Sequence, residues 1–139
     1  MGGEGLRFDQ IEVGMSESVS KTITDADIVL FAGISGDFNP IHIDEEYAKG
    51  TLWGGRIAHG GIAVALISAV LGTKLPGPGS IYISQNLRFL APIRVGDTVC
   101  ATVSVSSKDS QKKRVVLATR CAVGDVVVAE GESTLKLPG

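Results

Sequence analysis

The sequence has little net charge and lacks a long apolar run. The formal net charge of its 139 residues is −2, which gives no electrostatic attraction for nucleic acid or for an anionic membrane. The longest apolar run, Ile62 to Leu71, is interrupted by Ser68 and is too short to span a bilayer. We therefore expect a soluble, cytoplasmic protein with neither a nucleic acid nor a membrane as partner.

Sulfur is scarce as well. The two cysteines, Cys100 and Cys121, lie in strand-like segments and form neither a CxxC motif nor a zinc-ligand spacing. This pattern favours two reduced thiols in the core or sheet of a cytosolic protein. A disulfide framework or a metal site is the less favoured interpretation.

Repeats, low-complexity tracts and internal linkers are also missing from the sequence. A length of 139 residues, with 44% apolar and 20% charged residues, suits one domain with a core of its own. The start, Met1 to Gly5, has neither the basic head nor the apolar run of a signal peptide. We expect a flexible N-terminus over residues 1–9 and a single domain over residues 10–139.

Three helices are predicted in the first half of the chain. Thr24 is a candidate cap whose helix ends near Gly36, and Asp27 stands where it can bond back to the cap. A short helix is expected from Asp44 to Gly50. The third, from about Gly61 to Lys74, is apolar almost all round, so it should be buried centrally.

The second half of the chain reads as strands. Four runs rich in Val, Ile and Thr are separated by short turns, which indicates an antiparallel meander. A segment before the first helix, residues 11–23, is a candidate for one more strand. We predict an α+β domain whose sheet wraps the apolar helix. The four runs are residues 80–90, 98–107, 114–123 and 126–137.

The octet Ser35-Gly36-Asp37-Phe38-Asn39-Pro40-Ile41-His42 is the most informative segment. It places one of the two histidines of the chain five residues after an acid. A carboxylate and an imidazole together can form a proton-transfer pair. The glycine and the Asn-Pro step predict a fixed loop rather than a regular helix. From these residues alone, an Asx turn that ends the first helix is the competing interpretation.

The octet, followed by Ala58-His59-Gly60, resembles the hydratase signature of the MaoC-like family, and in more detail the short (R)-specific enoyl-CoA hydratases. The similarity extends over roughly residues 10–137. It implies a hot-dog fold, in which a curved antiparallel sheet wraps a long central helix. It also implies a homodimer or a higher homo-oligomer, in agreement with the open edge expected of a meander. Further segments that share the similarity are residues 71–72, 76–82, 87–92 and 95–97.

The resemblance implies reversible addition of water to a trans-2-enoyl-CoA, giving an (R)-3-hydroxyacyl-CoA. Asp37 and His42 would be the catalytic pair, and Asn39 would orient their loop. The Gly60 amide would bind the thioester oxygen, because the amino end of a helix offers a fixed partial positive charge to enolate-like charge. Neither a metal nor a cofactor is implied, since coenzyme A is part of the substrate.

Other side chains have weaker implied roles. Ser68 and Leu71 would line the substrate site, although a helix serine bonded to its backbone and a core leucine are the ordinary alternatives. His59 is interpreted as a structural histidine that holds the loop. Gly61 stands where the family often has a bulky apolar residue, so we expect a frayed first helical turn and a wider site.

Three other functions stay open from the sequence. The nearest is the reverse reaction, a 3-hydroxyacyl dehydratase acting on an acyl carrier protein, which would need a basic patch at the mouth of the site. A hot-dog thioesterase would have no reason to keep the D-x-N-P-x-H loop. A non-catalytic acyl-CoA binding module would be expected to lose Asp37 or His42, and both are present. Polyester synthesis and fatty-acid breakdown are the pathways that the leading function suggests.

Overall fold

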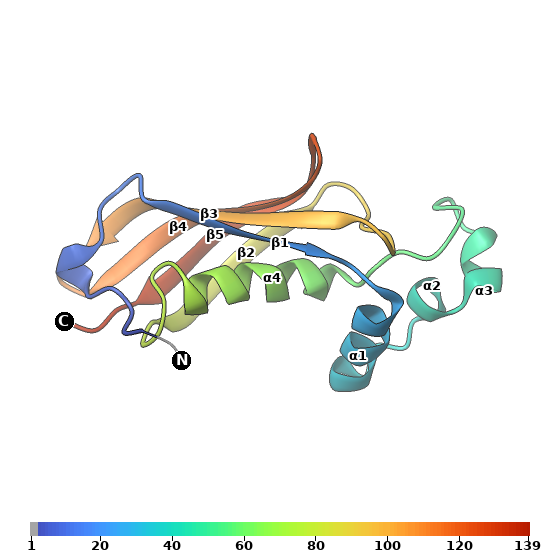
Figure 1. The fold of residues 1–139 in the computed structure, drawn as a ribbon, viewed down its shortest axis with the longest axis horizontal. Helices are drawn as coiled ribbons and strands as arrows, with labels where there is room; N and C mark the ends of the chain where they lie inside the picture. Colours follow the sequence, from blue (N-terminus) through green and yellow to red (C-terminus); the bar gives the residue numbers. More distant parts are fainter. Residues whose placement is uncertain (1–2) are drawn as a thin grey trace.

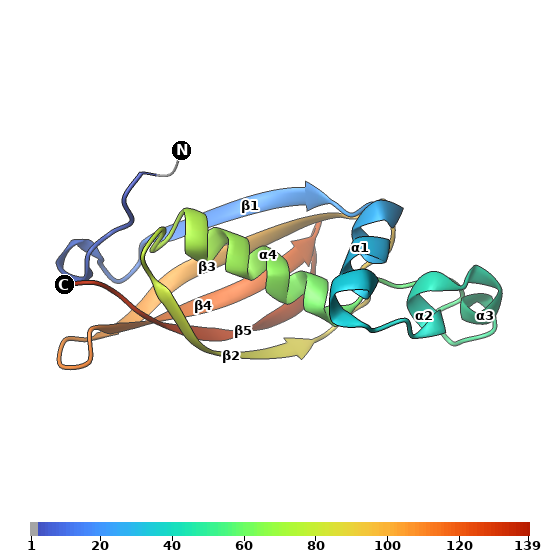
Figure 2. The same ribbon diagram turned by 90° about the horizontal axis from the view of Figure 1, so that it is seen from below.

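A long helix lies along one face of a curved antiparallel sheet (Figures 1 and 2). The computed structural model describes residues 3–139, so Met1 and Gly2 lie outside the described residues. The central helix is α4 (Gly60–Thr73). Around it, in chain order, are η1 (Phe8–Gln10), β1 (Ser16–Thr22), α1 (Asp25–Ser35), α2 (Pro40–Ile43), α3 (Glu45–Lys49), β2 (Ile81–Phe89), β3 (Thr98–Asp109), β4 (Arg114–Val123) and β5 (Val126–Lys136).

The five strands within residues 3–139 pair antiparallel in the order β1-β3-β4-β5-β2. Strands β3, β4 and β5 form the expected meander, but β2 pairs with β5 rather than with β3. The eight residues between β2 and β3 explain the difference. A connection of that length can cross the end of the sheet, whereas the short turns at 110–113 and 124–125 join neighbours. The segment 11–23 does contribute a strand, β1, which pairs with β3.

Alternation along the strands sets the two faces of the sheet. On β3, Val99, Ala101, Val103 and Val105 are buried, and the residues between them point to the outer face. The three valines are β-branched and suit a half-buried pleated surface. On the inner face, α4 covers the sheet with six buried side chains. These are Ile62, Ala63, Leu66, Ile67, Val70 and Leu71.

The opposite face of α4 is not covered in a single chain. Ala65, Ser68, Ala69 and Gly72 are exposed there, so the predicted central burial holds for one face of the helix only. This face is made of small residues, which allow another backbone or a ligand to approach the helix closely.

The first helix begins as its residues predict. The Thr24 side chain accepts a hydrogen bond from the Asp27 amide, and the Asp27 carboxylate accepts one from the Thr24 amide. The expected helix near 44–50 is also present, as α3. The octet, predicted to be a loop, contains the single turn α2. Proline does not prevent it, because Pro40 stands at the first helical position, where its missing N–H costs no hydrogen bond.

The N-terminal segment packs against the domain. The Leu6 amide donates to the Pro76 carbonyl at 2.9 Å, and the Phe8 amide donates to the Pro138 carbonyl at 3.0 Å. Phe8 is buried in the core. The packed unit thus includes Leu6 and Phe8, which lie before the boundary expected at residue 10, and the flexibility of the segment stays a prediction.

Both cysteines are free thiols, as the sequence indicates. Cys121 is buried on the inner face, and burial raises the pKa of its thiol to about 11. Cys100 lies on the outer face of β3, where hydrogen bonding to Ser20 lowers the pKa of its thiol. Among residues 3–139, no helix combines the length and apolarity that a membrane crossing requires.

Candidate active site

The octet turns the chain from α1 into α2 and fixes the Asp37 carboxylate. Helix α1 ends at Gly36, whose φ of 76° is left-handed and therefore suits glycine. The Ser35 hydroxyl accepts a hydrogen bond from the Asp37 amide, and Asp37 Oδ1 accepts one from the Asn39 amide, each at 3.1 Å. Asp37 is therefore held through Oδ1, and its second oxygen, Oδ2, remains available for chemistry.

Asn39 orients the next turn, as expected. Its Oδ1 accepts a hydrogen bond from the Ile41 amide at 3.2 Å, which caps α2. Helix α2 turns His42 inward, where its Nδ1 lies 2.7 Å from the Ile57 carbonyl oxygen. Because a carbonyl oxygen can only accept, Nδ1 bears the ring proton and Nε2 carries the lone pair.

The free atoms of the pair face each other. His42 Nε2 lies 3.9 Å from Asp37 Oδ2, too far for a direct hydrogen bond and near enough for one water molecule to contact both. The His42 side chain is 10% exposed, whereas that of Asp37 is 50% exposed. The structure therefore brings together the two predicted catalytic side chains around the space of one small molecule.

The amino end of α4 lies beside this pair. His59 is the N-cap of α4, so the amides of Gly60 and Gly61 belong to the first turn, which has no intrahelical acceptors. The Phe89 ring packs on Gly60, where an added Cβ would come within 2.9 Å of it. Gly60 nevertheless remains exposed and lines the cavity at the amino end of the helix, which is where an oxyanion donor is needed.

Gly61 does not widen the site. A Cβ built at this position would lie 2.3 Å from Cζ of Phe31, so the ring of Phe31 occupies the space that a side chain at 61 would use. The first turn of α4 is packed between two aromatic rings, Phe31 on one glycine and Phe89 on the other. The expectation of a wider site was wrong, because α1 supplies the missing bulk, and fraying of the first turn stays a prediction.

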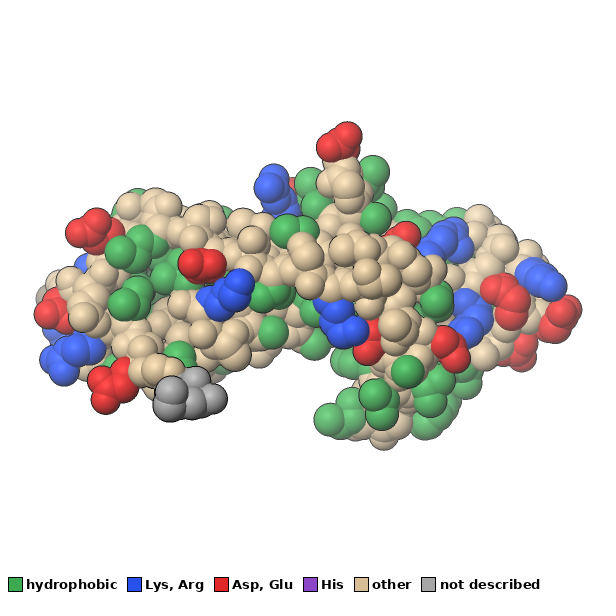
Figure 3. Space-filling view, in the orientation of Figure 1, with side chains coloured by type: hydrophobic (Ala, Val, Ile, Leu, Met, Phe, Trp, Pro, Cys, Tyr) green, Lys and Arg blue, Asp and Glu red, His purple; other side chains and the backbone are tan. Residues whose placement is uncertain are grey.

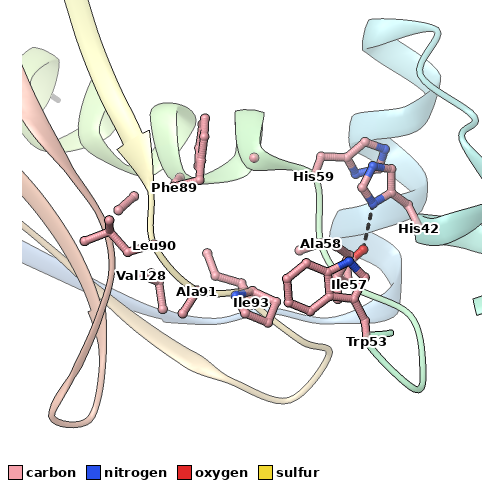
Figure 4. A pocket seen from close by; sticks show the side chains of 14 residues that line it. His42, Trp53, Ile57, Ala58, His59, Phe89, Leu90, Ala91, Ile93 and Val128 are labelled. Atoms are coloured by element: carbon pink, nitrogen blue, oxygen red, sulfur yellow. Dashed lines mark hydrogen bonds between the residues drawn. The ribbon is translucent and has the colours of Figure 1, made fainter. Parts of the chain in front are cut away.

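A cavity of about 400 Å³ opens next to these groups. Figure 4 shows His42 and His59 at one end and apolar side chains along the rest of it. Among the residues that line it are Trp53, Phe89, Leu90, Ala91 and Val128. The arrangement can hold an apolar chain whose polar end reaches His42, while Asp37 lies next to His42 and outside the cavity lining.

Two of the predicted substrate-binding residues do not line the cavity. Ser68 is on the exposed face of α4 and Leu71 is in the core, and neither lines this cavity. Their contact with substrate stays a prediction. Position along the helix explains the separation, since Ser68 is eight residues beyond Gly60, or roughly 12 Å at 1.5 Å per residue.

Two residues that support the site, Ile57 and Arg56, lie outside the motif and were not predicted from the sequence. The Ile57 carbonyl sets the His42 tautomer, and the Arg56 Nε donates to the His42 carbonyl at 2.6 Å. Arg56 also pairs with Asp25 of α1 at 2.7 Å. A backbone carbonyl leaves no sequence signal, and nothing in the spacing marks Arg56 as the link between α1 and α2.

Asp37, His42 and His59 bring one potential metal-ligand atom each within 4.8 Å of one another. The two imidazole rings are stacked, with centroids 3.9 Å apart and planes 30° apart. Nitrogen lone pairs lie in the ring planes, so two stacked rings cannot both point at one ion about 2 Å away. This geometry favours acid–base chemistry at the site over metal ligation.

The fold and these residues define a class of protein: a hot-dog domain that holds an acid–base pair beside the amino end of its central helix. The chain belongs to the MaoC-like domain family, whose model matches residues 8–126. The predicted fold class and family are thereby confirmed.

Individual relatives are similar over nearly the whole chain. It is 53% identical to an (R)-specific enoyl-CoA hydratase of Rhodospirillum rubrum, over 94% of this chain and 91% of the relative. It is 51% identical to a 3-hydroxybutyryl-CoA dehydratase of Methylorubrum extorquens, over 96% and 85%. The solved structure of an (R)-hydratase from A. caviae involved in PHA biosynthesis has a TM-score of 0.89 and 40% identity, covering 92% of this chain and 98% of that one.

Proposed function

We propose that this protein is an (R)-specific enoyl-CoA hydratase, a hydro-lyase that adds water reversibly to trans-2-enoyl-CoA. The observation that carries the proposal is the 3.9 Å gap between His42 Nε2 and Asp37 Oδ2 beside the Gly60 amide. The names of the hydratase and dehydratase relatives support the same reaction in its two directions.

The mechanism follows from where charge and protons must move. A water molecule between Asp37 and His42 gives its oxygen to C3 of the enoyl group, and the pair takes up one proton from that water. The thioester oxygen gains enolate-like charge, which the Gly60 amide stabilises through a fixed dipole. The pair then delivers a proton to C2. The product contains every atom of the water and the enoyl thioester.

The apolar cavity serves this chemistry by excluding bulk water around the thioester. Addition of water changes no net oxidation state, so the reaction needs no redox cofactor. The acid–base pair and the Gly60 amide can supply every proposed step without a metal. The two free thiols support placing the reaction in the cytoplasm. Polyester synthesis and fatty-acid breakdown are the pathways in which we propose that this reaction serves.

Homodimer formation is part of the proposal. Leu30 and Ile34 of α1 are 71% and 85% exposed, and apolar side chains gather on this helix below the end of the sheet in Figure 3. Ile81 and Ile83 are exposed on β2, an edge strand with unpaired backbone groups. The small-residue face of α4 is open beside them, and a second copy of the chain would cover these surfaces together.

We expect a solution mass of about twice the 14.4 kDa of one chain. Light scattering coupled to size exclusion measures it at micromolar concentration. Charged substitutions at two exposed positions, Leu30→Glu with Ile34→Glu, should shift the mass toward the monomer. A matched change at an exposed polar site, Ser110→Glu in the 110–113 turn, should leave the mass unchanged. A wild-type monomer at tens of micromolar would contradict the dimer.

The reaction is tested by adding purified protein to crotonyl-CoA and following the loss of enoyl absorbance. We expect hydration, and chiral analysis of the product should give the (R)-3-hydroxyacyl-CoA. Release of free thiol would instead identify a thioesterase. An enoyl-acyl-carrier-protein arm, run at equal concentration, tests the nearest alternative. A folded protein inert toward short and medium enoyl-CoAs would contradict the proposed function.

The names of the more similar relatives favour coenzyme A over a carrier protein as the acyl carrier. A carrier protein is acidic and would need free basic side chains at the cavity mouth. Arg56 is paired with Asp25, and Arg94 donates from Nη2 to the Trp53 carbonyl at 2.6 Å. The same end of the molecule includes the acidic start of α3 at Glu45 and Glu46.

A further inference from the structure

His59 contacts both members of the proposed catalytic pair. The residue is 2% exposed, and its Nε2 lies 2.9 Å from the backbone carbonyl oxygen of Asp37. A carbonyl can only accept, so Nε2 carries the proton and donates it. Although His59 is the N-cap of α4, its side chain makes no capping bond, so the imidazole is directed to the Asp37 loop instead.

The ring faces of His59 are also occupied. One contact is with the His42 ring, at 3.9 Å between centroids and 30° between planes. The other is with Phe31, at 4.8 Å and 47°. Among residues 3–139, the second nitrogen of His59, Nδ1, is buried without a hydrogen-bond partner. The ring is therefore held by one hydrogen bond and by its two aromatic neighbours.

These contacts join three parts of the site. Phe31 comes from α1, His59 from the start of α4, and His42 from α2. His59 immediately precedes Gly60, the proposed oxyanion donor. Movement of this imidazole would displace the Asp37 carbonyl and the His42 ring relative to the amide.

We propose that His59 is a positioning residue, which fixes Asp37 through its Nε2–H and His42 through its ring face. This role rests on the proposed function. It makes His59 a functional residue of the site in addition to the acid–base pair and the oxyanion amide. Catalysis depends on such alignment, since a misplacement of about 1 Å can lower a rate by about 100-fold.

The two contacts can be separated by substitution. His59→Gln keeps an N–H donor for the Asp37 carbonyl and removes the aromatic ring. His59→Phe keeps the ring and removes the donor. We expect each variant to lower kcat for crotonyl-CoA about 10- to 100-fold with KM within about threefold of wild type, because the other residues that line the cavity keep their contacts with substrate. The double loss, His59→Ala, should be more severe than either.

A control separates positioning from lost stability. Val103→Ala removes buried bulk from the sheet, away from the cavity lining, and should lower the melting temperature with little change in kcat. If His59→Gln and His59→Phe fold and retain wild-type kcat, the proposal is wrong. It is also wrong if they raise KM alone.

A spectroscopic measurement tests the same inference independently of the activity assay. Imidazole ¹⁵N shifts at pH 8 should show His59 as the Nε2–H tautomer and His42 as the Nδ1–H tautomer in wild type. In His59→Gln, which loses the ring contact, His42 should populate a mixture of tautomers, whereas in His59→Phe, which keeps a ring beside His42, the Nδ1–H tautomer should persist. The Nδ1–H tautomer of His59 in wild type would overturn the proposal, even if the variants do not fold. If wild type shows the expected tautomers but no hydration, the proposed function fails and the positioning contacts stand.

Discussion

Replacing Asp37 by Asn, or His42 by Ala, is expected to lower kcat for enoyl-CoA hydration by about 10²- to 10⁴-fold, the range typical of acid–base groups. Asp37→Asn is a sharp test. Asn keeps an Oδ1 that can accept from the Asn39 amide, so the loop geometry survives while the carboxylate is lost. His42→Asn serves similarly, since its amide N–H can still donate to the Ile57 carbonyl while Nε2 is removed.

Crotonyl-CoA hydration, measured with melting temperatures for each variant, checks this expectation. Asp44→Asn is the matched control, because Asp44 is a nearby exposed carboxylate that caps α3 through Oδ1, and Asn caps a helix equally well. That variant should keep wild-type kcat. If the two groups act on one water, the double variant should be little slower than the worse single variant. If Asp37→Asn retained more than half of the wild-type activity, the Asp37 carboxylate would have no catalytic role.

Sequence reasoning reached the parts of the site that lie close together in the chain. The Thr24 and Asp27 capping box is an i, i+3 pattern, and the Asp37–His42 pair sits within one octet, so local spacing was enough to predict both. Helix α4 was also predictable, because its composition is apolar almost throughout, although only one of its faces is buried in the chain.

The missed features depend on contacts between distant segments. Pairing of β2 with β5 is decided by how the chain crosses the sheet, which no local pattern encodes. The short helix α2 was missed because the Asn-Pro step was interpreted as a break, whereas Asn39 caps the turn and proline begins it. The contact between the Phe31 and His59 rings joins positions 28 residues apart, and a single sequence contains no signal for it.

Gly61→Ala is expected to destabilise the protein by about 1–3 kcal/mol, as overpacking of a filled space does. The new Cβ would lie 2.3 Å from Phe31 Cζ, so the ring must move. Helix propensity alone predicts the opposite result, because Ala is favoured over Gly inside a helix by up to about 1 kcal/mol. Gly72→Ala is the matched control on the same helix, with no atom of the chain within 4 Å of its Cβ, and it should stabilise when both changes are measured in the Leu30→Glu, Ile34→Glu background, where a second copy does not cover Gly72.

Urea unfolding at one fixed protein concentration measures both effects, since the stability of an oligomer depends on concentration. Stabilisation of Gly61→Ala to the same degree as Gly72→Ala would show that the Phe31 ring does not fill this space. Because Phe31 also contacts His59, the clash should lower kcat in addition to stability.

Combining Gly61→Ala with Phe31→Leu tests whether the two positions share one space. Leucine is shorter than phenylalanine, so the double variant should recover about 1 kcal/mol or more of the overpacking cost relative to Gly61→Ala alone. Phe31→Leu in the wild-type background should instead lose packing and become less stable. A coupling energy of this sign would show that the bulk found at position 61 in the family is supplied here from α1, and additive effects would contradict it.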